Sequence, residues 1–393
     1  MQYESIFRLI MYLNRLAGKL ILNYIRYFPV VCVTGPRQSG KTTLIRNLFP
    51  DVPYFTFEDP DTRLIFTDDP KGFLNSLPEG ALFDEAQQIP EIFSYVQGIV
   101  DSPEFKGKFI LSGSQNFLLL DKVTQSLAGR TGIVKLLPFS LAELESHFSL
   151  NLNDYILRGF YPRVYNDNIP PEYFYPNYIQ TYIERDIANI KSITDKTAFF
   201  RFLKFCAARC GQLLNYSQLA VDCGIAVNTA KAWLSLLVSS YIVFLLPPWF
   251  SNISKQLIKS PKLYFYDTGL ATWLLDIKKA DQLEPHYMFG SLFENFVMSE
   301  IIKSIANIEG SFSCFFLRNK TGHEIDLLLK NDRLVCAEIK SGKTFHPEYI
   351  KNLLYYNEMI KPDDRILIYS GDLNTEFKGV KTITWRQISS LFK

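Results

Sequence analysis

The clearest candidate for chemistry is the run Gly35-Pro36-Arg37-Gln38-Ser39-Gly40-Lys41-Thr42, which matches the spacing GxxxxGK[ST]. Its glycines let the backbone curl so that successive N–H groups converge on an anion, and a helix starting here adds its positive dipole. Lys41 can reach the β- and γ-phosphates of a nucleotide, and the Thr42 hydroxyl can ligate Mg²⁺. Together with Thr43, this run predicts a site for ATP and Mg²⁺. The alternative is a chance glycine turn.

An acidic pair, Asp84-Glu85, follows the apolar run 81–83. At the end of a strand one sheet position from the glycine loop, Asp84 can hold Mg²⁺ and Glu85 can polarise the attacking water. Another apolar run, 109–111, ends in small polar residues, of which Ser114 or Gln115 can sense the γ-phosphate or orient water. The competing interpretations are an acidic pair favoured at a helix N-terminus and a polar strand cap.

Arg130, in the run SLAGR, is a candidate arginine finger acting in cis or across a subunit boundary. Such a finger is worth about 10³–10⁵ in rate. The alternative is an ordinary surface arginine. The catalytic candidates are therefore Glu85, Lys41, Ser114 and Arg130.

The runs GPRQSGKTTL, LFDEAQ, LSGSQNF and SLAGR occur in this order and spacing. In this the chain resembles the AAA-type (AAA+ or STAND-like) ATP-binding proteins of bacteria and archaea that carry a C-terminal domain of unknown function. The resemblance covers essentially the whole chain. It implies an AAA-like core with Asp84 and Glu85 in the Walker B role and Ser114 in the sensor role.

A second set of polar residues lies near the C-terminus. Asp326 is embedded in an apolar run, and Glu338-Ile339-Lys340 ends the next run. A hairpin turning at Asn331-Asp332 would place Asp326 beside Glu338 and Lys340, which share one strand face. Glu294, on a preceding helix, could add a fourth group. Two carboxylates and a lysine around Mg²⁺ can activate water against a phosphodiester, so Asp326 and Glu338 are candidate ligands of a second Mg²⁺.

This C-terminal arrangement resembles the PD-(D/E)xK nuclease fold, with a helix, three strands, a helix and a strand in matching order. The alternative is an ordinary charged hairpin face. That alternative explains poorly why Asp326 lies between apolar neighbours, since burying an unpaired charge is costly. The resemblance implies a nuclease-like fold, either active or retained as a scaffold.

The segment 212–241 is expected to form two helices separated by Cys223-Gly224-Ile225, with Gly224 in a left-handed conformation. With strand-like runs near 241–245 and 262–266, it predicts a winged helix-turn-helix whose second helix is capped by Asn228 or Thr229. A DNA reader would present to the groove Asn228, Thr229, Lys231 and Ala232. The segment 191–260 contains eight Lys and Arg residues and two acidic residues, in a chain of net charge +2. This local excess of positive charge is a modest indication of nucleic-acid binding. The alternative is a module that packs on protein.

The elements expected to position these sites indicate an α/β fold class. Strand candidates at 28–34, 54–57, 81–83, 109–111 and 133–136 alternate with helix-length segments, as in a parallel sheet covered on both faces. A helix near 3–26 is expected to pack on this domain. We expect a parallel-sheet P-loop NTPase core at 1–140, a helical lid or connector at 141–205, a winged helix at 206–270 and a smaller α/β restriction-endonuclease-like domain at 280–393.

Composition favours several packed domains, since 47% of the 393 residues are hydrophobic and 21% are charged. Six scattered cysteines indicate reduced thiols, and no apolar run is long enough to span a membrane, so a cytoplasmic protein is expected. The expected ligands are ATP and Mg²⁺. Further candidate partners are DNA, another protein or a second copy of the chain.

Three functions fit these observations. The leading hypothesis is an ATPase whose nucleotide state drives the winged-helix and nuclease-like modules, with action on DNA as an extension. The first alternative is a nucleotide-dependent switch or scaffold with an inactive nuclease-like domain. The second is a metal-dependent endonuclease gated by ATP.

Overall fold

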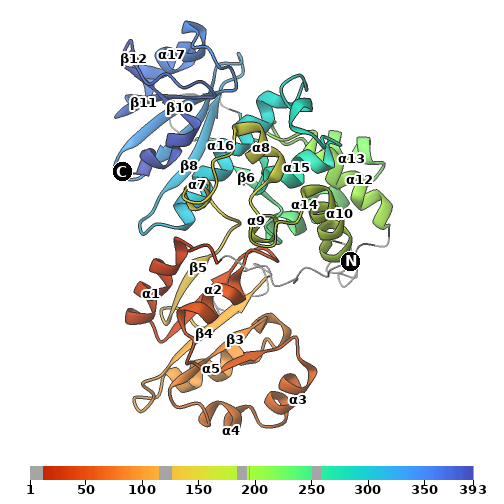
Figure 1. Ribbon diagram of the computed structural model, residues 1–393, viewed down its shortest axis with the longest axis vertical. Coiled ribbons are helices and arrows are strands. Elements are labelled where there is room, and N and C mark those ends of the chain that lie inside the picture. The colour runs from red at the N-terminus through yellow and green to blue at the C-terminus, as the bar shows by residue number, and fades with distance from the viewer. Residues whose placement is uncertain (1–11, 115–125, 184–192, 194, 250–257, 393) are drawn as a thin grey trace, which may run out of the picture. The chain divides into compact units, whose positions relative to one another are not determined.

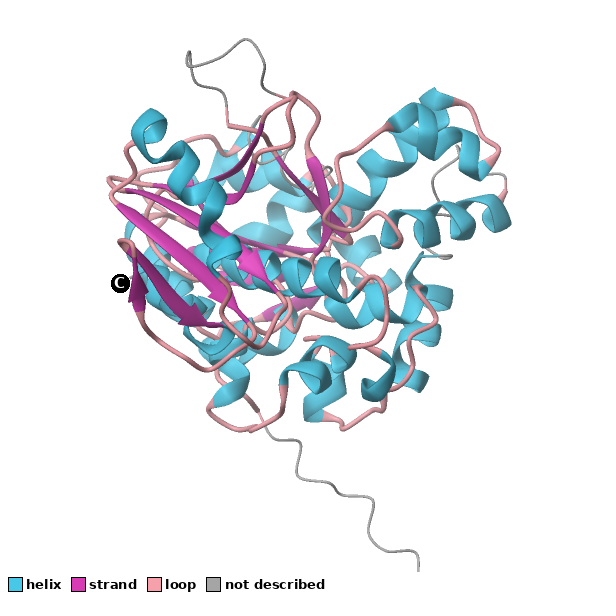
Figure 2. Ribbon diagram, turned by 90° about the horizontal axis from the view of Figure 1, so that it is seen from above, coloured by secondary structure: helices cyan, strands magenta, loops and turns pink. Residues whose placement is uncertain are grey.

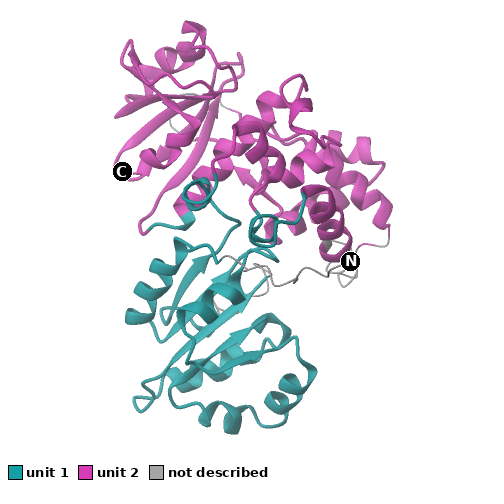
Figure 3. Ribbon diagram, in the orientation of Figure 1, with its two compact units in different colours: residues 1–148, 161–170, 306–308 teal, residues 149–160, 171–305, 309–393 magenta. Residues whose placement is uncertain are grey.

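The computed structural model describes residues 12–114, 126–183, 193, 195–249 and 258–392. The order of its helices and strands along the chain is shown in Figure 1. The chain divides into two compact units (Figure 3). The N-terminal unit comprises 1–148, 161–170 and 306–308, and the C-terminal unit comprises 149–160, 171–305 and 309–393.

The N-terminal unit is built on a sheet of five parallel strands in the order β2-β3-β4-β1-β5. The strands are β1 (Val30–Thr34), β2 (Tyr54–Thr56), β3 (Gly80–Asp84), β4 (Lys108–Gly113) and β5 (Thr131–Lys135). The parallel sheet is confirmed. The predicted position of the acidic strand is wrong, because β4 inserts between β1 and β3 and separates them by one strand.

Both faces of this sheet are covered, because alternate residues of each strand point to opposite sides. Val30, Cys32 and Phe83 face one side, and Val31, Val33 and Leu82 face the other. The first side packs against α3 (Pro60–Asp68), α4 (Pro70–Asn75) and α5 (Ile92–Val100). The second packs against α1 (Ala17–Tyr27) and α2 (Lys41–Leu48). The unit also holds η1 (Ala86–Gln88), α7 (Leu141–Glu145) and α9 (Pro162–Asn166).

Helices make up most of the first half of the C-terminal unit. They are α8 (Leu152–Arg158), α10 (Pro171–Tyr178), the π-helix η2 (Ile179–Ile183), α12 (Lys196–Ala207), α13 (Tyr216–Cys223), α14 (Val227–Ser239), α15 (Thr268–Leu274) and η3 (Ala280–Gln282). Two strands, β6 (Val243–Leu246) and β7 (Lys262–Phe265), pair antiparallel as a separate ribbon. No single helix in the described ranges could cross a membrane by length and apolarity, although α13 and α14 pass that test jointly as a pair bent by 102°.

The predicted helix pair is present in α13 and α14. Gly224 ends α13 in the left-handed conformation, with φ 68° and ψ 36°. The predicted cap is wrong, because α14 already begins at Val227 and its cap position is Ala226, which puts Asn228 and Thr229 inside the first turn. Trp233 is buried against Phe199 and Phe202 and so anchors α14 to α12.

The chain ends in a second sheet, preceded by the long helix α16 (Phe289–Ala306). Its six strands lie in the order β12-β13-β11-β10-β9-β8. Figure 2 shows the strands of the chain in magenta and the helices in cyan. The elements are β8 (Ser313–Arg318), β9 (Glu324–Lys330), β10 (Leu334–Lys340), η4 (Pro347–Ile350), α17 (Lys351–Ile360), β11 (Asp364–Tyr369), β12 (Glu376–Phe377), β13 (Val380–Thr384) and η5 (Trp385–Phe392). The predicted antiparallel hairpin of β9 and β10 is present. The expected order of helix, three strands, helix and strand is followed by two further strands.

Candidate functional site

The loop between β1 and α2 has the backbone that an anion site needs. A Cβ at Gly35 would lie 2.0 Å from the carbonyl oxygen of Leu136, so only glycine fits there. Gly40 has a φ of 90° and turns the chain directly into α2, whose N-terminus has no side-chain cap. The first amides of α2 are thus left to a ligand, and the helix dipole favours a negative one.

Lys41 is held inside this loop. It is only 5% exposed, and its Nζ donates to the carbonyl oxygens of Gly35 at 3.0 Å and Pro36 at 2.9 Å. Burial lowers the pKa of Lys41, against the opposing effect of Glu85 and Asp84. Ser39 is fully buried, and its Oγ has no hydrogen-bond partner among the described residues. The loop therefore holds a confined cation next to an unused polar atom, which suits a phosphate.

Asp84 joins the end of β3 to this loop. Its Oδ2 accepts hydrogen bonds from Thr42 Oγ1 at 2.6 Å and from the Tyr54 hydroxyl at 3.1 Å, while Ser112 donates to its Oδ1. Burial and the Asp84 charge raise the pKa of Tyr54 to about 12. A hydroxyl and a carboxylate side by side are the protein ligands that a phosphate-bound Mg²⁺ uses, so Thr42 and Asp84 fit that ion.

Glu85 is positioned beside Ser114. Its φ of 53° is unusual for a non-glycine residue and turns the side chain away from the line of β3. Its Oε2 accepts from Ser114 Oγ at 3.1 Å and from the amide of Gln87, which itself lies 3.5 Å from Ser114 Oγ. Gln87, Tyr54 and Ser112 were not identified from the sequence, although the run DEAQ contains the signal for Gln87.

Arg15 fixes the backbone next to the glycine loop between β1 and α2 through buried hydrogen bonds. Nothing in its sequence context indicates this role. Its guanidinium donates to the carbonyl oxygens of Ser39 and Leu137, each at 2.6 Å, and forms an ion pair with Glu143 at 3.1 Å. Glu143 also accepts from Ser140 in the capping box of α7. The side chains of Arg15 and Glu143 are 4% and 1% exposed, so this is a buried ion pair fixing one carbonyl of the glycine loop.

A cavity of about 490 Å³ opens next to the loop, within the N-terminal unit. Gln38, Gly40 and Thr43 line one side, and α9 contributes Pro162 and Asn166. The side-chain oxygens of Gln38 and Asn166 are buried and have no hydrogen-bond partner in the described part of the chain. Its volume is in the range of small-molecule sites, so it can receive the base and ribose of a nucleotide whose phosphates lie on the loop.

Arg130 is not brought to this site. It precedes β5 at the amino edge of the parallel sheet, whereas the glycine loop, Asp84 and Ser114 follow the carboxyl ends of their strands. A five-residue strand separates those edges by roughly 16 Å. Arg130 instead pairs with Asp101, and both side chains are partly exposed. A finger role in cis therefore does not fit this geometry, and Gln115 lies outside the described residues.

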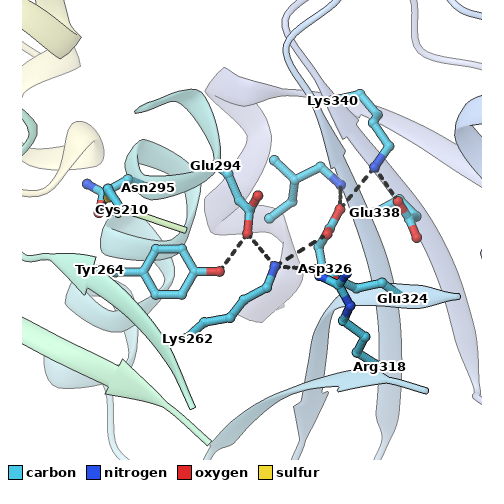
Figure 4. Close-up of polar contacts among 11 residues, drawn as sticks. Cys210, Lys262, Tyr264, Glu294, Asn295, Arg318, Glu324, Asp326, Glu338 and Lys340 are labelled. Carbon is cyan, nitrogen blue, oxygen red and sulfur yellow. Dashed lines mark hydrogen bonds and ion pairs between the residues drawn. The ribbon is translucent and has the colours of Figure 1, made fainter. Parts of the chain in front are cut away.

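The C-terminal set of polar residues does come together (Figure 4). Lys340 Nζ lies 2.5 Å from Glu338 Oε2 and 3.2 Å from Asp326 Oδ2, and the Ile339 amide donates to Asp326 Oδ2 at 2.8 Å. Glu294 accepts from the Tyr264 hydroxyl at 2.6 Å and from Lys262 at 2.9 Å. Lys262, which the sequence did not single out, links Glu294 to Asp326.

The charges in this cluster compensate one another. Burial works against the charge on Lys262, but Glu294, Asp326 and Glu324 together raise its pKa. Burial and then the Asp326 charge raise the pKa of Glu338 well above its usual value. Burial also disfavours the charge on Asp326, yet Lys340 and Lys262 hold its pKa below the usual value. No group of three or more His, Cys, Asp or Glu within the described ranges is arranged to hold a metal ion. Lys262 and Lys340 are thus the cations beside Asp326 and Glu338 in this structure, and the second Mg²⁺ at these two carboxylates stays a prediction.

The face of α14 proposed to read DNA is only partly available. Asn228, Lys231 and Ala232 are exposed, and Thr229 is half-buried. Lys231 Nζ lies 5.8 Å from the centre of the Tyr216 ring. This surface offers a single cation, which is little for a phosphate backbone.

Comparison with protein families divides the chain into three matched segments. Residues 27–145 match an AAA domain, and residues 149–281 and 289–388 match two domains of unknown function, DUF8612 and DUF4143. Two curated relatives are the uncharacterized proteins Rv2008c of Mycobacterium tuberculosis and Mb2031c of Mycobacterium bovis. Each is 33% identical over 323 residues, which cover 80% of this chain and 71% of the relative.

Similar solved structures are distant. The Walker-type ATPase paby2304 of Pyrococcus abyssi has a TM-score of 0.46 and 16% identity, over 70% of this chain and 99% of that one. A STAND protein with a tetratricopeptide repeat sensor, PH0952 of Pyrococcus horikoshii, has a TM-score of 0.28 and 11% identity, over 76% and 47%. AMPPCP-bound DnaA of Aquifex aeolicus has a TM-score of 0.27 and 15% identity, over 56% and 85%.

Proposed function

The chain belongs to the family of the mycobacterial proteins Rv2008c and Mb2031c, and from its AAA domain and the geometry around it we propose that it binds ATP with Mg²⁺ and hydrolyses it. One observation carries this proposal. The Thr42 hydroxyl of the glycine loop contacts the Asp84 carboxylate at 2.6 Å, and Glu85 is turned onto Ser114 directly beside them. The residues proposed to bind phosphate, metal and water therefore lie together at one edge of the sheet.

Each residue has a separate task in the proposed reaction. The amides of the loop and Lys41 bind the β- and γ-phosphates, for which Lys41 exchanges its two carbonyl partners for phosphate oxygens. Thr42 and Asp84 would hold Mg²⁺, which when bound neutralises charge developing on the phosphates. Glu85 orients the attacking water and takes its proton. Ser114 and Gln87 fix the direction of the Glu85 carboxylate.

The proposed result of hydrolysis is a rearrangement of the C-terminal unit. DNA is the candidate partner of the exposed face of α14, and Arg130 would act as a finger only from a second copy of the chain. The alternative is a slow nucleotide switch or scaffold whose nuclease-like domain does not cut. Lys262, which is not part of the predicted nuclease set, binds Glu294 and lies 3.9 Å from Asp326, and this favours that alternative over an ATP-gated endonuclease.

Nucleotide binding tests the first step. We expect Lys41→Ala to weaken the binding of a fluorescent ATP analogue at least tenfold, because it removes a charge-assisted contact to phosphate. Lys19→Ala is the matched control, since Lys19 is exposed on α1 of the same unit and should leave the affinity unchanged. Equal affinity of the wild type and Lys41→Ala would contradict the site.

The effect of DNA on ATP turnover distinguishes an ATPase that acts on DNA from a nucleotide switch. Stimulation of phosphate release by DNA, lost on Lys231→Ala, would support a nucleic-acid machine. Tight ATP binding with negligible turnover, unaffected by DNA, would support the switch.

A further inference from the structure

Lys262 is a buried cation that enters the C-terminal carboxylate cluster from outside its sheet. It begins β7, which belongs to the β6–β7 ribbon, and its side chain is 3% exposed. Its Nζ lies 2.9 Å from Glu294 Oε1 on α16 and 3.9 Å from Asp326 Oδ1 on β9, and it also contacts Glu324 Oε1 on β9. Three carboxylates thus converge on a single nitrogen (Figure 4).

We propose that the Lys262 ammonium is the resident cation of this cluster and holds the position that a divalent metal ion would take among Glu294, Glu324 and Asp326. Carboxylate oxygens are the ligands of Mg²⁺ and Ca²⁺, at about 2.0–2.1 Å and 2.3–2.6 Å respectively. The 2.9 Å between Lys262 and Glu294 is instead the length of a hydrogen bond from nitrogen to oxygen. The contact is therefore a charge-assisted hydrogen bond, and Lys262 Nζ occupies the point on which the three carboxylates converge.

The charge of the cluster leaves little attraction for a further cation. Glu294, Glu324, Asp326 and Glu338 supply four acidic groups. The basic groups are Lys262, Lys340 and Arg318, of which Arg318 lies 3.0 Å from Glu324. At most one negative charge is uncompensated, and the raised pKa of Glu338 reduces it. A divalent ion added to this set would leave excess positive charge in a buried site, which is costly.

The fold fixes Lys262 in this position through its neighbours. Lys262 pairs with Leu246 across the ribbon, and three residues further on the amide of Phe265 donates to Asn295 Oδ1 at 2.7 Å. Asn295 returns a hydrogen bond to the Phe265 carbonyl at 3.2 Å. Because Asn295 follows Glu294 on α16, the same turn of that helix binds the backbone of β7 at Phe265 and the side chain of Lys262.

Two consequences follow. The cluster ties the β6–β7 ribbon to the C-terminal sheet, and it excludes a catalytic metal as long as β7 is docked. Loss of the lysine charge should convert the same carboxylates into a divalent-cation site. All residues of the cluster belong to the C-terminal unit, so the role of Lys262 does not depend on ATP hydrolysis.

Binding of Mn²⁺ to the full-length protein without nucleotide, followed by electron paramagnetic resonance, tests the proposal. We expect no Asp326-dependent binding by the wild type or by Lys259→Ala, an exposed lysine three residues away. Lys262→Met, which keeps the packing of the side chain, should gain about one Mn²⁺ per chain. Adding Asp326→Asn to this variant should abolish the gain, and Mn²⁺ should raise the Tm of Lys262→Met alone.

Lys262→Gln provides a second variant, since its amide can still donate to Glu294, and its expected behaviour is the same. Asp326-dependent binding of Mn²⁺ by the wild type would overturn the proposal. So would a folded Lys262→Met or Lys262→Gln protein, shown by circular dichroism, that gains no Mn²⁺.

Discussion

The role assigned to Arg15 leads to a sharp prediction about stability. Arg15→Ala removes a guanidinium that donates to two carbonyls and pairs with Glu143, all of them buried. Breaking a buried ion pair costs about 3–5 kcal/mol. Glu143 keeps hydrogen bonds from the amides of Leu16 at 2.8 Å and Ser140 at 2.7 Å. We therefore expect Arg15→Ala to lower the free energy of unfolding by about 3 kcal/mol, the lower end of that range.

Arg130→Ala is the matched control, because Arg130 also pairs with a carboxylate in the N-terminal unit. Its side chain and that of Asp101 are 35% and 44% exposed, however. Exposed pairs contribute little to stability, because solvent and salt screen them. The two variants therefore separate a buried arginine pair from a surface one within the same fold.

Hydrogen–deuterium exchange is the suitable assay, since all four tryptophans (Trp233, Trp249, Trp273 and Trp385) belong to the C-terminal unit and do not report on this one. A loss of 3 kcal/mol should speed exchange of the slowest β1 amides roughly 100-fold in Arg15→Ala. Arg130→Ala should change it by less than about fivefold. Rates within a factor of about three for the two variants would refute the supporting role of Arg15.

Two further predictions concern single contacts. The raised pKa of Glu338 means that the folded state keeps a proton on this residue at pH values where the unfolded chain has lost it. The free energy of unfolding should therefore fall as pH rises above about 4.3, by up to about 1.4 kcal/mol per pH unit. Urea titrations followed by tryptophan fluorescence should show a shallower decline with pH in Glu338→Gln than in the wild type, and equal slopes would contradict this role of Glu338. Gly35→Ala places a Cβ 2.0 Å from the Leu136 carbonyl oxygen and should weaken ATP binding at least tenfold. Gly98→Ala is the control, since nothing lies within 4 Å of its added Cβ, and it should leave ATP binding unchanged. Titration with the fluorescent ATP analogue measures both affinities.

Local sequence patterns predict the parts of the site that lie next to each other in the chain. The run from Gly35 to Thr42 predicts both the turn and the helix start, and the apolar runs before Asp84 and Ser114 predict that each of these residues follows the end of a strand. The spatial order of the strands does not follow from chain order, so the insertion of β4 between β1 and β3 was missed. The cis alternative for Arg130 does not fit for a related reason, since a residue just before a strand lies at the opposite edge of a parallel sheet.

Long-range charge pairs are harder to predict. Arg15 and Glu143 are 128 residues apart, and Lys262 and Asp326 come from different sheets. Each lies in a run without a recognisable motif, so only the folded chain brings the partners together. The C-terminal carboxylates were identified because Asp326 interrupts an apolar strand, but the lysine that neutralises them was not.

In the proposed function, the loop between β1 and α2 hydrolyses ATP together with Asp84 and Glu85. The most direct measurement is Mg²⁺-dependent phosphate release by the full-length wild type and by Glu85→Gln, with ATP affinity measured on the same samples. We predict that Glu85→Gln keeps ATP affinity within about threefold and loses at least 100-fold in turnover, because only the proton acceptor is removed. Equal turnover by the two proteins would contradict the assignment.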